Sequence, residues 1–242
     1  CFHNLMDQPN KKFISGKLIK RYKRFFADVQ LDNTNQIVTA HCPNTGSMLG
    51  LLKEGNPVRL TKVNSKKRKL KFTLEIIKSN GANVGVNTHR ANRIVEEALT
   101  SNKIKSLKKI VDLKREVKYG ENSRIDFLIK NNIDEQIYIE VKNVTLSLKK
   151  SIAEFPDAIT ERGSKHLTEL QKIINKKTRA IMLYLIQRDD CKYFRIAKEI
   201  DEKYNSNLKK AIKSGVEILC YNCKFENNKI QIDKKIKFVE NE

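Results

Sequence analysis

Several features common in other protein classes are missing from this sequence. Its 242 residues include no tryptophan, and no apolar run approaches the roughly 20 residues that a membrane-spanning helix needs. A Gly-rich phosphate-binding loop, a dinucleotide-binding fingerprint and internal repeats are also absent. The five cysteines are odd in number and irregularly spaced, and no secretory signal is recognisable. We therefore expect a cytoplasmic protein with reduced thiols that neither enters a membrane nor depends on a nucleotide cofactor.

Acidic residues are scarce relative to basic ones. The chain has 49 lysines and arginines against 28 aspartates and glutamates, which gives a formal net charge of +21. Clusters of basic residues neutralise neighbouring phosphates, so they predict a nucleic acid as partner, DNA foremost and RNA not excluded. A general bias toward lysine, asparagine and isoleucine would instead scatter lysines without function. The basic residues are densest in the first third of the chain and form two clusters there, one of Lys17, Lys20, Arg21, Lys23 and Arg24 and one of Lys66, Lys67, Arg68, Lys69 and Lys71.

The first basic cluster also contains aromatic residues. Tyr22, Phe25 and Phe26 are interleaved with its cations, a mixture that can follow a phosphate backbone while offering rings to bases. We expect Tyr22 to stack on bases and Phe26 to fill a core. The nearby loop at residues 43–48 is rich in hydroxyl and amide groups, and either bonds phosphates or simply makes a turn. The nucleic-acid-binding candidates are Lys20, Arg21, Tyr22, Lys23, Arg24, Asn44, Thr45, Ser47, Lys66, Lys67, Arg68 and Lys69.

The first part of the chain has the pattern of a small β-barrel. Five short strands fit an OB-like barrel over residues 11–85. Residues 1–10 are expected to be a flexible or artificially added segment in front of it. The strands are predicted from short alternating runs between Asn, Gly and Pro turns, at residues 19–31, 36–42, 57–63, 70–77 and 84–86.

Residues 86–242 have the pattern of an α/β domain. The run at residues 179–187 is almost continuously apolar, which favours a central strand buried on both faces. The elements together predict a mixed sheet with helices on both faces. Helices are predicted at residues 91–101, 157–175 and 201–214, and strands at residues 114–119, 124–129, 136–144, 179–187 and 216–225, the last of them ending the fold.

The second and third of these strands carry a cluster of charged residues. A turn-like stretch centred on Ile133 joins them, and an antiparallel hairpin with this centre puts Asp126 opposite Glu140, with Cβ atoms about 5 Å apart. Side chains alternate along a strand, so Lys142 shares a face with Glu140. The alternative is an ordinary cross-strand ion pair on a solvated sheet face.

Asp126, Glu140 and Lys142 suggest a particular chemistry. Two adjacent carboxylates repel each other unless a cation lies between them. Carboxylate oxygens with open positions beside them suit Mg²⁺ or Mn²⁺, which keeps water and takes phosphate oxygens from a substrate. We therefore predict that Asp126 and Glu140 hold the metal, while Lys142 acts on an activated water or stabilises the charge on the phosphorane. The predicted reaction is phosphodiester hydrolysis.

The same residues carry a family resemblance. Asp126, thirteen intervening residues and then Glu140-Val141-Lys142 resemble the PD-(D/E)xK nuclease core. Over about residues 16–221, the chain is similar to the sugar fermentation stimulation protein A (SfsA) family. The resemblance implies DNA binding and a fold in which a five-stranded OB-like β-barrel precedes a PD-(D/E)xK nuclease-like mixed sheet flanked by helices. The matching segments are GKLIKRYKRFFADV, TAHCPNTGSMLGLL, NSKKRKLKFTLE, NRIVEEAL, REVKYGENSRIDFLI, YIEVKNVTL and FPDAITERGSKHLTEL.

Nuclease folds of this kind often take a third metal ligand from a helix. In the predicted helix at residues 91–101, Glu96 and Glu97 border the apolar face, and Asn92 is a competing position. We choose Glu96, although a solvated helix flank explains both glutamates as well. By the same analogy, Glu161, Arg162, Lys165 and His166 of the next helix are expected near the site, where His166 is either a proton carrier or a structural residue.

Two functions follow from the sequence. The first is a DNA-binding nuclease that depends on Mg²⁺. The second, implied by the family resemblance, is a non-catalytic DNA-binding regulator of sugar-utilisation genes that keeps a nuclease-like scaffold. No helix-turn-helix is recognisable, so we expect contacts to phosphates to dominate affinity. The sequence makes no prediction of oligomeric state.

Overall fold

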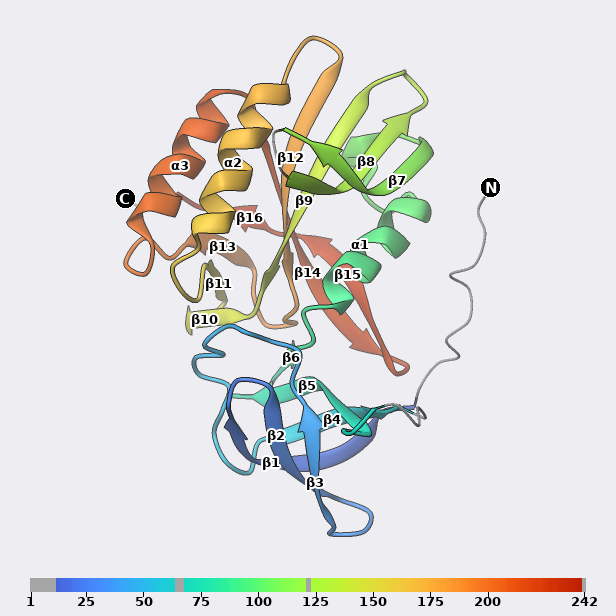
Figure 1. The fold of residues 1–242 in the computed structure, drawn as a ribbon, viewed down its shortest axis with the longest axis vertical. Coiled ribbons are helices and arrows are strands. Elements are labelled where there is room, and N and C mark those ends of the chain that lie inside the picture. The colour runs from blue at the N-terminus through green and yellow to red at the C-terminus, as the bar shows by residue number, and fades with distance from the viewer. Residues whose placement is uncertain (1–11, 64–67, 121–122, 241–242) are drawn as a thin grey trace.

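The computed structural model describes residues 12–63, 68–120 and 123–240. Figure 1 shows a β-barrel formed by the N-terminal part of the chain and, packed on it, a larger unit in which helices cover a sheet. The predictions made for residues 1–10, Lys66 and Lys67 lie outside the described residues.

The barrel contains five strands that close on themselves. They follow the order β3-β2-β1-β4-β5, and a parallel pairing of β3 with β5 closes the ring. Alternate residues point inward, so Leu18, Val29 and Leu60 are almost completely buried. This ring is the predicted OB-like barrel. The strands are β1 (Ile14–Tyr22), β2 (Phe26–Leu31), β3 (Ile37–His41), β4 (Pro57–Lys62) and β5 (Phe72–Ser79).

Two barrel predictions were wrong in detail. Residues 19–31 form a hairpin of two strands rather than one strand, because Lys23 and Arg24 adopt left-handed φ angles of 47° and 61° and turn the chain. The run at residues 84–86 belongs mostly to β6 (Ala82–Gly85), which pairs with β5 outside the closed ring. Five barrel strands are present, but β1 and β2 replace one predicted strand and β6 is not among the five.

The second unit is built around a six-stranded mixed sheet of order β15-β14-β12-β9-β8-β7. β12 (Thr178–Ile186) lies inside it and runs parallel to both of its neighbours. The helix α1 (Arg90–Thr100) covers one face, and α2 (Glu161–Ile173) and α3 (Glu202–Lys213) cover the other (Figure 1). The other strands are β7 (Ile110–Tyr119), β8 (Ser123–Asn131), β9 (Gln136–Val144), β14 (Glu217–Glu226) and β15 (Lys229–Lys235).

Burial of β12 on both faces explains its apolar run. Ile181 and Leu183 pack in the core beneath α1, whereas Met182 and Tyr184 pack beneath α2 and α3. A strand that is buried between two helical layers is apolar over its buried stretch, which here runs from Ala180 to Ile186. The prediction of a buried central strand is therefore confirmed.

Some elements of this unit differ from the predictions. The helix predicted from residue 157 begins at Glu161, because the Thr160 hydroxyl accepts a hydrogen bond from Gly163 N (3.1 Å) and caps it. β14 does not end the fold, since β15 pairs with it as a hairpin. A second, four-stranded sheet and a short 3₁₀ helix were not predicted: β10 (Leu146–Lys149), β11 (Ile152–Phe155), β13 (Tyr193–Ile196), β16 (Lys237–Phe238) and η1 (Lys105–Leu107).

Specific contacts fix the barrel against the larger unit. The buried carboxylate of Glu75 in β5 accepts a hydrogen bond from Arg90 Nε (2.5 Å) at the start of α1. Gly85 N donates to the carbonyl oxygen of Gln187 (2.8 Å). The two units therefore keep a defined orientation. Among the described residues, no helix is long and apolar enough to cross a membrane.

Candidate active site and nucleic-acid interface

The hairpin of β8 and β9 has the predicted register. Phe127 pairs with Ile139 and Ile129 with Ile137, which centres the antiparallel pairing on Ile133. The regular ladder ends at the pair of Phe127 with Ile139, one residue before Asp126 and Glu140 would meet. The two carboxylates are therefore neighbours at the point where the strands stop pairing; Glu140 lies on the side of the sheet covered by α2, in contact with His166.

Where the β8–β9 pairing ends, the Asp126 side chain takes the place of a backbone carbonyl group as a hydrogen-bond acceptor. Its Oδ2 accepts a hydrogen bond from Val141 N (2.7 Å), and its Oδ1 accepts one from Asn92 Nδ2 (2.7 Å) of α1. Burial and the nearby charge of Glu140 raise the pKa of Asp126 to about 6, despite these two hydrogen bonds. Asp126 is thus held rigidly, and its negative charge is poorly compensated by the protein.

Glu140 is buried, and only one of its oxygens is satisfied. Lys142 Nζ donates to Oε1 (2.8 Å), and His166 Nδ1 contacts the same oxygen. Burial favours the neutral acid, but the bonds from His166 and Lys142 outweigh it and lower the pKa of Glu140. Glu140 Oε2 is buried without a hydrogen-bond partner. A buried carboxylate oxygen without a partner is costly unless another ligand binds it.

His166 connects Glu140 to a further cation. Arg162 Nε donates to His166 Nε2 (3.4 Å), so this ring nitrogen is the acceptor. The imidazole proton then lies on Nδ1 and is donated to Glu140. Since Lys142 Nζ and this Nδ1–H are both donors, their 3.2 Å approach is a shared contact with Glu140 and not a hydrogen bond between them. His166 is thereby part of the carboxylate site.

The structure places the candidates for a third metal ligand in different surroundings. Glu96 accepts an ion pair from Arg115 Nη1 (2.8 Å), and Glu97 pairs with Arg93 Nε (3.1 Å) on the helix surface. Only Asn92 is joined to Asp126, as stated above. Within residues 12–63, 68–120 and 123–240, no three His, Cys, Asp or Glu side chains could hold a metal by themselves. The role of Glu96 as third ligand stays a prediction.

Two further polar groups near the carboxylates were not foreseen from the sequence. The Tyr119 hydroxyl and Glu169 Oε2 are buried without hydrogen-bond partners. Burial raises the pKa of Tyr119, and the charges of Glu140, Glu169 and Asp126 add to the effect. Lys165 Nζ lies 3.8 Å from Glu169 Oε1, one turn further along α2. No spacing rule identifies these residues, because they meet through packing of α2 on the sheet.

Barrel closure brings the turn at Lys23 and Arg24 and the segment with Arg68 and Lys69 to the same end of the barrel. Tyr22 pairs with Phe26, Phe26 with His41, and His41 with Thr73. The turn of the β1–β2 hairpin and the segment between β4 and β5 both adjoin this set of paired residues. Arg68 belongs to that segment, and its Nη2 lies 3.0 Å from His41 Nδ1. The candidates Lys20 to Arg24, Arg68 and Lys69 therefore lie at the same end of the barrel.

Several of these candidates already have intramolecular partners. Phe26 stacks on the Tyr22 ring (5.4 Å between centroids), and Lys20 Nζ lies 5.5 Å from that ring's centroid. Arg21 Nη2 donates to the carbonyl oxygens of Asn44 (2.8 Å) and Gly46 (3.1 Å), and so supports the loop at residues 43–48. By contrast, Lys23, Arg24 and Lys69 are exposed to solvent.

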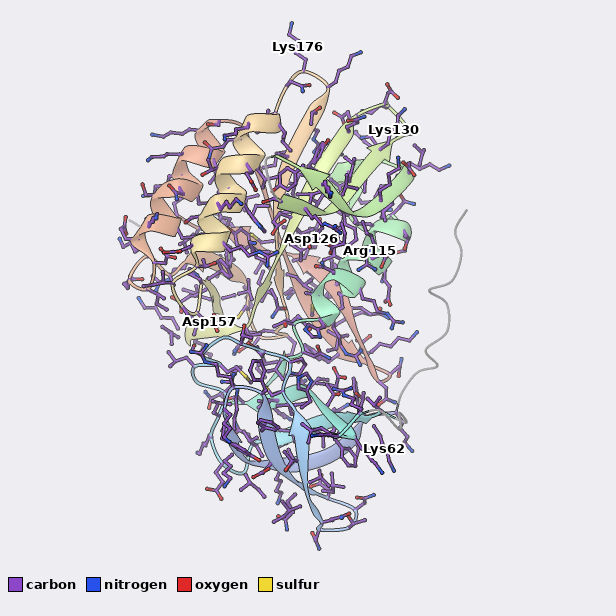
Figure 2. All side chains as sticks on the ribbon, in the orientation of Figure 1. Lys62, Arg115, Asp126, Lys130, Asp157 and Lys176 are labelled. Atoms are coloured by element: carbon purple, nitrogen blue, oxygen red, sulfur yellow. The ribbon has the colours of Figure 1, made fainter. Side chains whose placement is uncertain are left out.

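The loop at residues 43–48 touches both units. The Asn44 amide is buried and donates to the Val86 carbonyl oxygen (3.2 Å), so its side chain fixes the loop. Ser47 Oγ donates to the Asp157 carbonyl oxygen (3.1 Å) in the larger unit, and Thr45 is exposed. Figure 2 shows Asp157 at this boundary, with Asp126 deeper in the larger unit.

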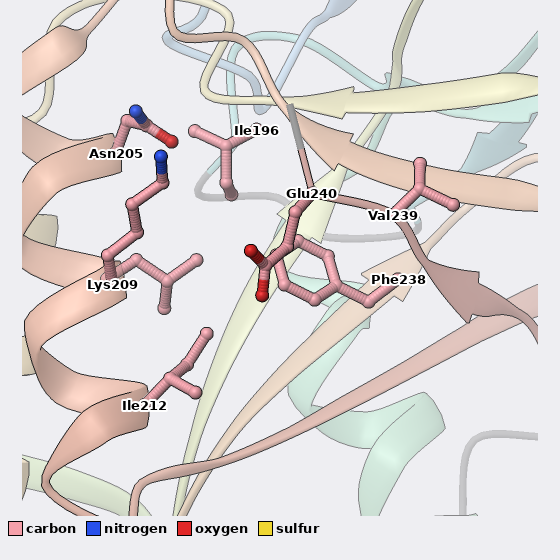
Figure 3. Close-up of a pocket in the computed structure, with 8 residues that line it drawn as sticks. Ile196, Asn205, Lys209, Ile212, Phe238, Val239 and Glu240 are labelled. Carbon is pink, nitrogen blue, oxygen red and sulfur yellow. The ribbon is translucent and has the colours of Figure 1, made fainter. Parts of the chain in front are cut away.

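Two hollows differ strongly in size and surroundings. A cleft of about 640 Å³ lies beside the loop at residues 43–48, between the barrel and the larger unit. A second hollow of about 10 Å³, between α3 and the segment from Phe238 to Glu240, has room for little more than one water molecule (Figure 3). Among the described residues, the cleft is therefore the better candidate to receive a ligand.

Comparison with known proteins gives consistent matches over nearly the whole chain. The SfsA N-terminal OB domain matches residues 19–86, and the sugar fermentation stimulation protein RE domain matches residues 89–229. A sugar fermentation stimulation protein homolog of Pelagibacter ubique is 51% identical over 229 residues, covering 95% of this chain and 97% of the relative. One of Nitrosococcus oceani is 44% identical over 225 residues, covering 92% and 95%.

The fold is also found in a solved structure. Pyrococcus furiosus SfsA, solved in complex with Ca²⁺, superposes with a TM-score of 0.84 at 24% sequence identity. The match covers 98% of this chain and 99% of that chain. The predicted architecture, an OB-like barrel followed by a nuclease-like mixed sheet flanked by helices, is thereby confirmed.

Proposed function

The chain belongs to the sugar fermentation stimulation protein (SfsA) family, and we propose that it binds DNA and hydrolyses phosphodiester bonds at a divalent metal held by Asp126 and Glu140. The observation that carries the proposal is the state of Glu140. One of its oxygens is fixed by Lys142 and His166, while the other is buried without a partner beside a second carboxylate. This arrangement suits a cation better than it suits a structural ion pair.

The residues present fit a divalent metal. Glu140 Oε2 is free to bind one, and each Asp126 oxygen accepts one hydrogen bond and retains a lone pair. Two carboxylates are a sufficient protein contribution for Mg²⁺ or Mn²⁺, which keep several waters and bind substrate phosphate oxygens. A bound cation would supply Lewis-acid polarisation of the phosphate. That the P. furiosus relative was solved with Ca²⁺ supports the same kind of site.

The remaining residues have roles that follow from their contacts. Lys142, whose side chain is only 14% exposed, can stabilise the negative charge that develops on the phosphoryl oxygens. His166 fixes the orientation of the Glu140 carboxylate, and Arg162 fixes the tautomer of His166. Asn92 holds Asp126. These positioning contacts hold the carboxylates and the ammonium close together.

DNA is the proposed partner because of the charge distribution. The net charge of +21 gives long-range attraction to any polyanion, and the exposed Lys23, Arg24 and Lys69 supply phosphate contacts at one barrel end. This barrel end lies beside the cleft, since Arg21 and Arg24 are among the cleft's lining residues. Binding and hydrolysis would therefore use adjacent parts of the molecule.

The test is a cleavage assay on labelled single-stranded, duplex and branched DNA in Mg²⁺, Mn²⁺ or EDTA. We expect metal-dependent cleavage that is lost in Asp126→Asn and in Lys142→Ala, with binding retained in both. Binding without cleavage of any substrate under any of these conditions would reject hydrolysis. It would favour the second function, a non-catalytic DNA-binding regulator on a nuclease-like scaffold.

A further inference from the structure

The cleft between the barrel and the larger unit has a defined place relative to the carboxylate site. Its barrel side is formed by Arg21, Arg24 and the loop at residues 43–48, and its other side by the end of β9 and by residues 154–160. β9 carries Glu140 and Lys142 and then enters the cleft with Asn143 and Val144. At about 3.3 Å per residue, Val144 lies roughly 7 Å beyond Lys142 on the same strand face.

A second element also connects the cleft to the site. Thr160 lines the cleft and caps α2, and His166 lies six residues further along this helix, in contact with Glu140. A rise of 1.5 Å per residue puts His166 about 9 Å from Thr160 along the helix axis. Arg162 lies between them. Val144 and Thr160 of the cleft therefore lie within about 10 Å of Lys142 and His166 along β9 and α2, although the carboxylates themselves are not among the residues that line the cleft.

The walls of the cleft are fixed in place. Arg21 holds two carbonyl groups of the loop at residues 43–48, and Ser47 Oγ donates to the Asp157 carbonyl oxygen (3.1 Å) across the boundary. A Cβ atom at Gly46 would lie 2.2 Å from Asp157 Oδ2, so a larger residue there would force the Asp157 side chain to move. A cleft held open by such contacts requires little reorganisation when a ligand binds.

The size and chemistry of the cleft limit what it can bind. A volume of about 640 Å³ is that of a site for a drug-sized ligand, which is the scale of one or two nucleotides and too small for a duplex. Arg24 supplies a cation for a phosphate. Phe25 follows Arg24 in the chain but is not among the residues that line the cleft. It is 45% exposed, and in contrast to Tyr22 no ring stacking is observed for it among the described residues. An exposed ring next to a cation suits an unstacked base and its phosphate.

We propose that this cleft binds a single-stranded segment of the DNA substrate, such as an overhang, a flap or an unpaired end, with Arg24 on a phosphate and Phe25 stacked on a base. The inference rests on the proposed function, because the segment would deliver its phosphodiester to Asp126, Glu140 and Lys142. It names the substrate class: nucleic acid with an unpaired strand, in preference to an uninterrupted duplex. It also replaces Tyr22 by Phe25 as the stacking residue.

The experiment measures binding separately from cleavage. Fluorescence anisotropy in EDTA gives the Kd of the full chain for a labelled 20-nucleotide oligo(dT) and for a blunt 20-base-pair duplex. We expect the wild type to bind the single strand more tightly. Phe25→Ala should weaken single-strand binding about tenfold, as loss of one base–ring stack does. Arg24→Glu should weaken single-strand binding at least as much, and by a larger factor than it weakens duplex binding, because Arg24 also contributes to the general attraction of phosphates. Phe25→Ala should change duplex binding by about twofold or less.

Matched controls separate the cleft from general effects. Lys176→Glu makes the same charge change as Arg24→Glu at the far end of the larger unit (Figure 2). Ile37→Ala removes an exposed apolar side chain at the opposite end of β3 from the rung containing Phe26. Both controls should leave the two Kd values within about twofold of wild type, with all variants melting at the wild-type temperature.

Two results would overturn the assignment of the cleft. The first leaves the proposed DNA binding intact, and the second does not. If the cleft variants and their controls affect both DNA forms equally, or if the duplex binds more tightly than oligo(dT), then the cleft is not a single-strand site while the proposed DNA binding remains. If neither DNA form binds at low salt, the proposed function and the cleft assignment both fail.

Discussion

The carboxylate site and the basic surface of the barrel are built in opposite ways. The Glu140 and His166 side chains are 4% and 6% exposed, and each is bonded to at least one other charged or ionisable group. On the barrel, the Lys20 side chain is 65% exposed, and its contact with Asp28 is a loose 3.9 Å. Hydrolysis requires a fixed geometry, whereas attraction of phosphates requires only charge density. Substitutions should therefore have large and specific effects in the first region and small, salt-dependent effects in the second.

The largest effect is expected from Asp126→Asn. The substitution removes a negative ligand while preserving shape, so cleavage should fall by about 10³-fold or more and DNA affinity should stay within about twofold. The matched control is Asp134→Asn, which removes an exposed carboxylate that pairs with Lys130 (2.6 Å) in the turn between β8 and β9. Cleavage by Asp126→Asn within tenfold of the control would show that the carboxylate site is not the site of hydrolysis.

The second prediction concerns stability as a function of pH. The pKa of Asp126 is raised to about 6, from about 3.9 in an unfolded chain. Asp126 therefore binds its proton more tightly in the folded state than in the unfolded state. The stabilisation that results is fully present below about pH 4 and is lost as the pH rises to about 6. The loss is up to about 3 kcal/mol in the free energy of unfolding.

Urea unfolding between pH 4 and 8 measures this effect. The difference between wild type and Asp126→Asn isolates Asp126 from other titrating groups, including Glu140, whose lowered pKa acts in the opposite direction. Relative to the variant, the wild type should lose stability between pH 4 and 6. Added Mg²⁺ should restore part of the loss at pH 7.5 in the wild type only. If the difference in unfolding free energy between wild type and Asp126→Asn does not change with pH, then the Asp126 carboxylate is not a buried, poorly compensated charge.

A third prediction tests the positioning role of His166. His166→Ala frees Glu140 Oε1 from one of its two contacts, so the affinity for Mg²⁺ measured by calorimetry and the rate of cleavage should each fall about 10- to 100-fold. His166→Gln should lose less, because an amide can donate the same hydrogen bond. Thr168→Ala, in the same helix, removes only a bond to the Ser164 carbonyl oxygen and is the control. Equal losses in His166→Ala and His166→Gln would reject a positioning role.

The smallest effect is expected on the barrel surface. Lys23→Ala removes one exposed cation, so the slope of log affinity against log salt should decrease by about 1 while cleavage at saturating DNA is unchanged. Lys203→Ala, on the exposed side of α3, is the control and should leave the slope unaltered. An unchanged slope in Lys23→Ala would place the phosphate contacts elsewhere on the molecule.

Local patterns in the sequence were sufficient for the elements and for part of the site. The hairpin register that brings Asp126 to Glu140 depends on a short turn and on alternation within two strands. Lys142 follows from the same alternation. The apolar run of β12 and the face of α1 that packs on the sheet are likewise properties of neighbouring residues. Each of these features is set by contacts between residues close in the chain, which is why a pattern could predict them.

Only the tertiary structure decided the surroundings of these residues. His166 and Asn92 reach the carboxylates because α2 and α1 pack on opposite faces of the sheet at particular positions, which no spacing in the chain specifies. The split of residues 19–31 into a hairpin depends on left-handed φ angles at non-glycine residues. The cleft beside Arg24 exists because the barrel is held against the end of β9. Such contacts between distant segments are set by how the whole chain packs, and so they could not be read from local sequence.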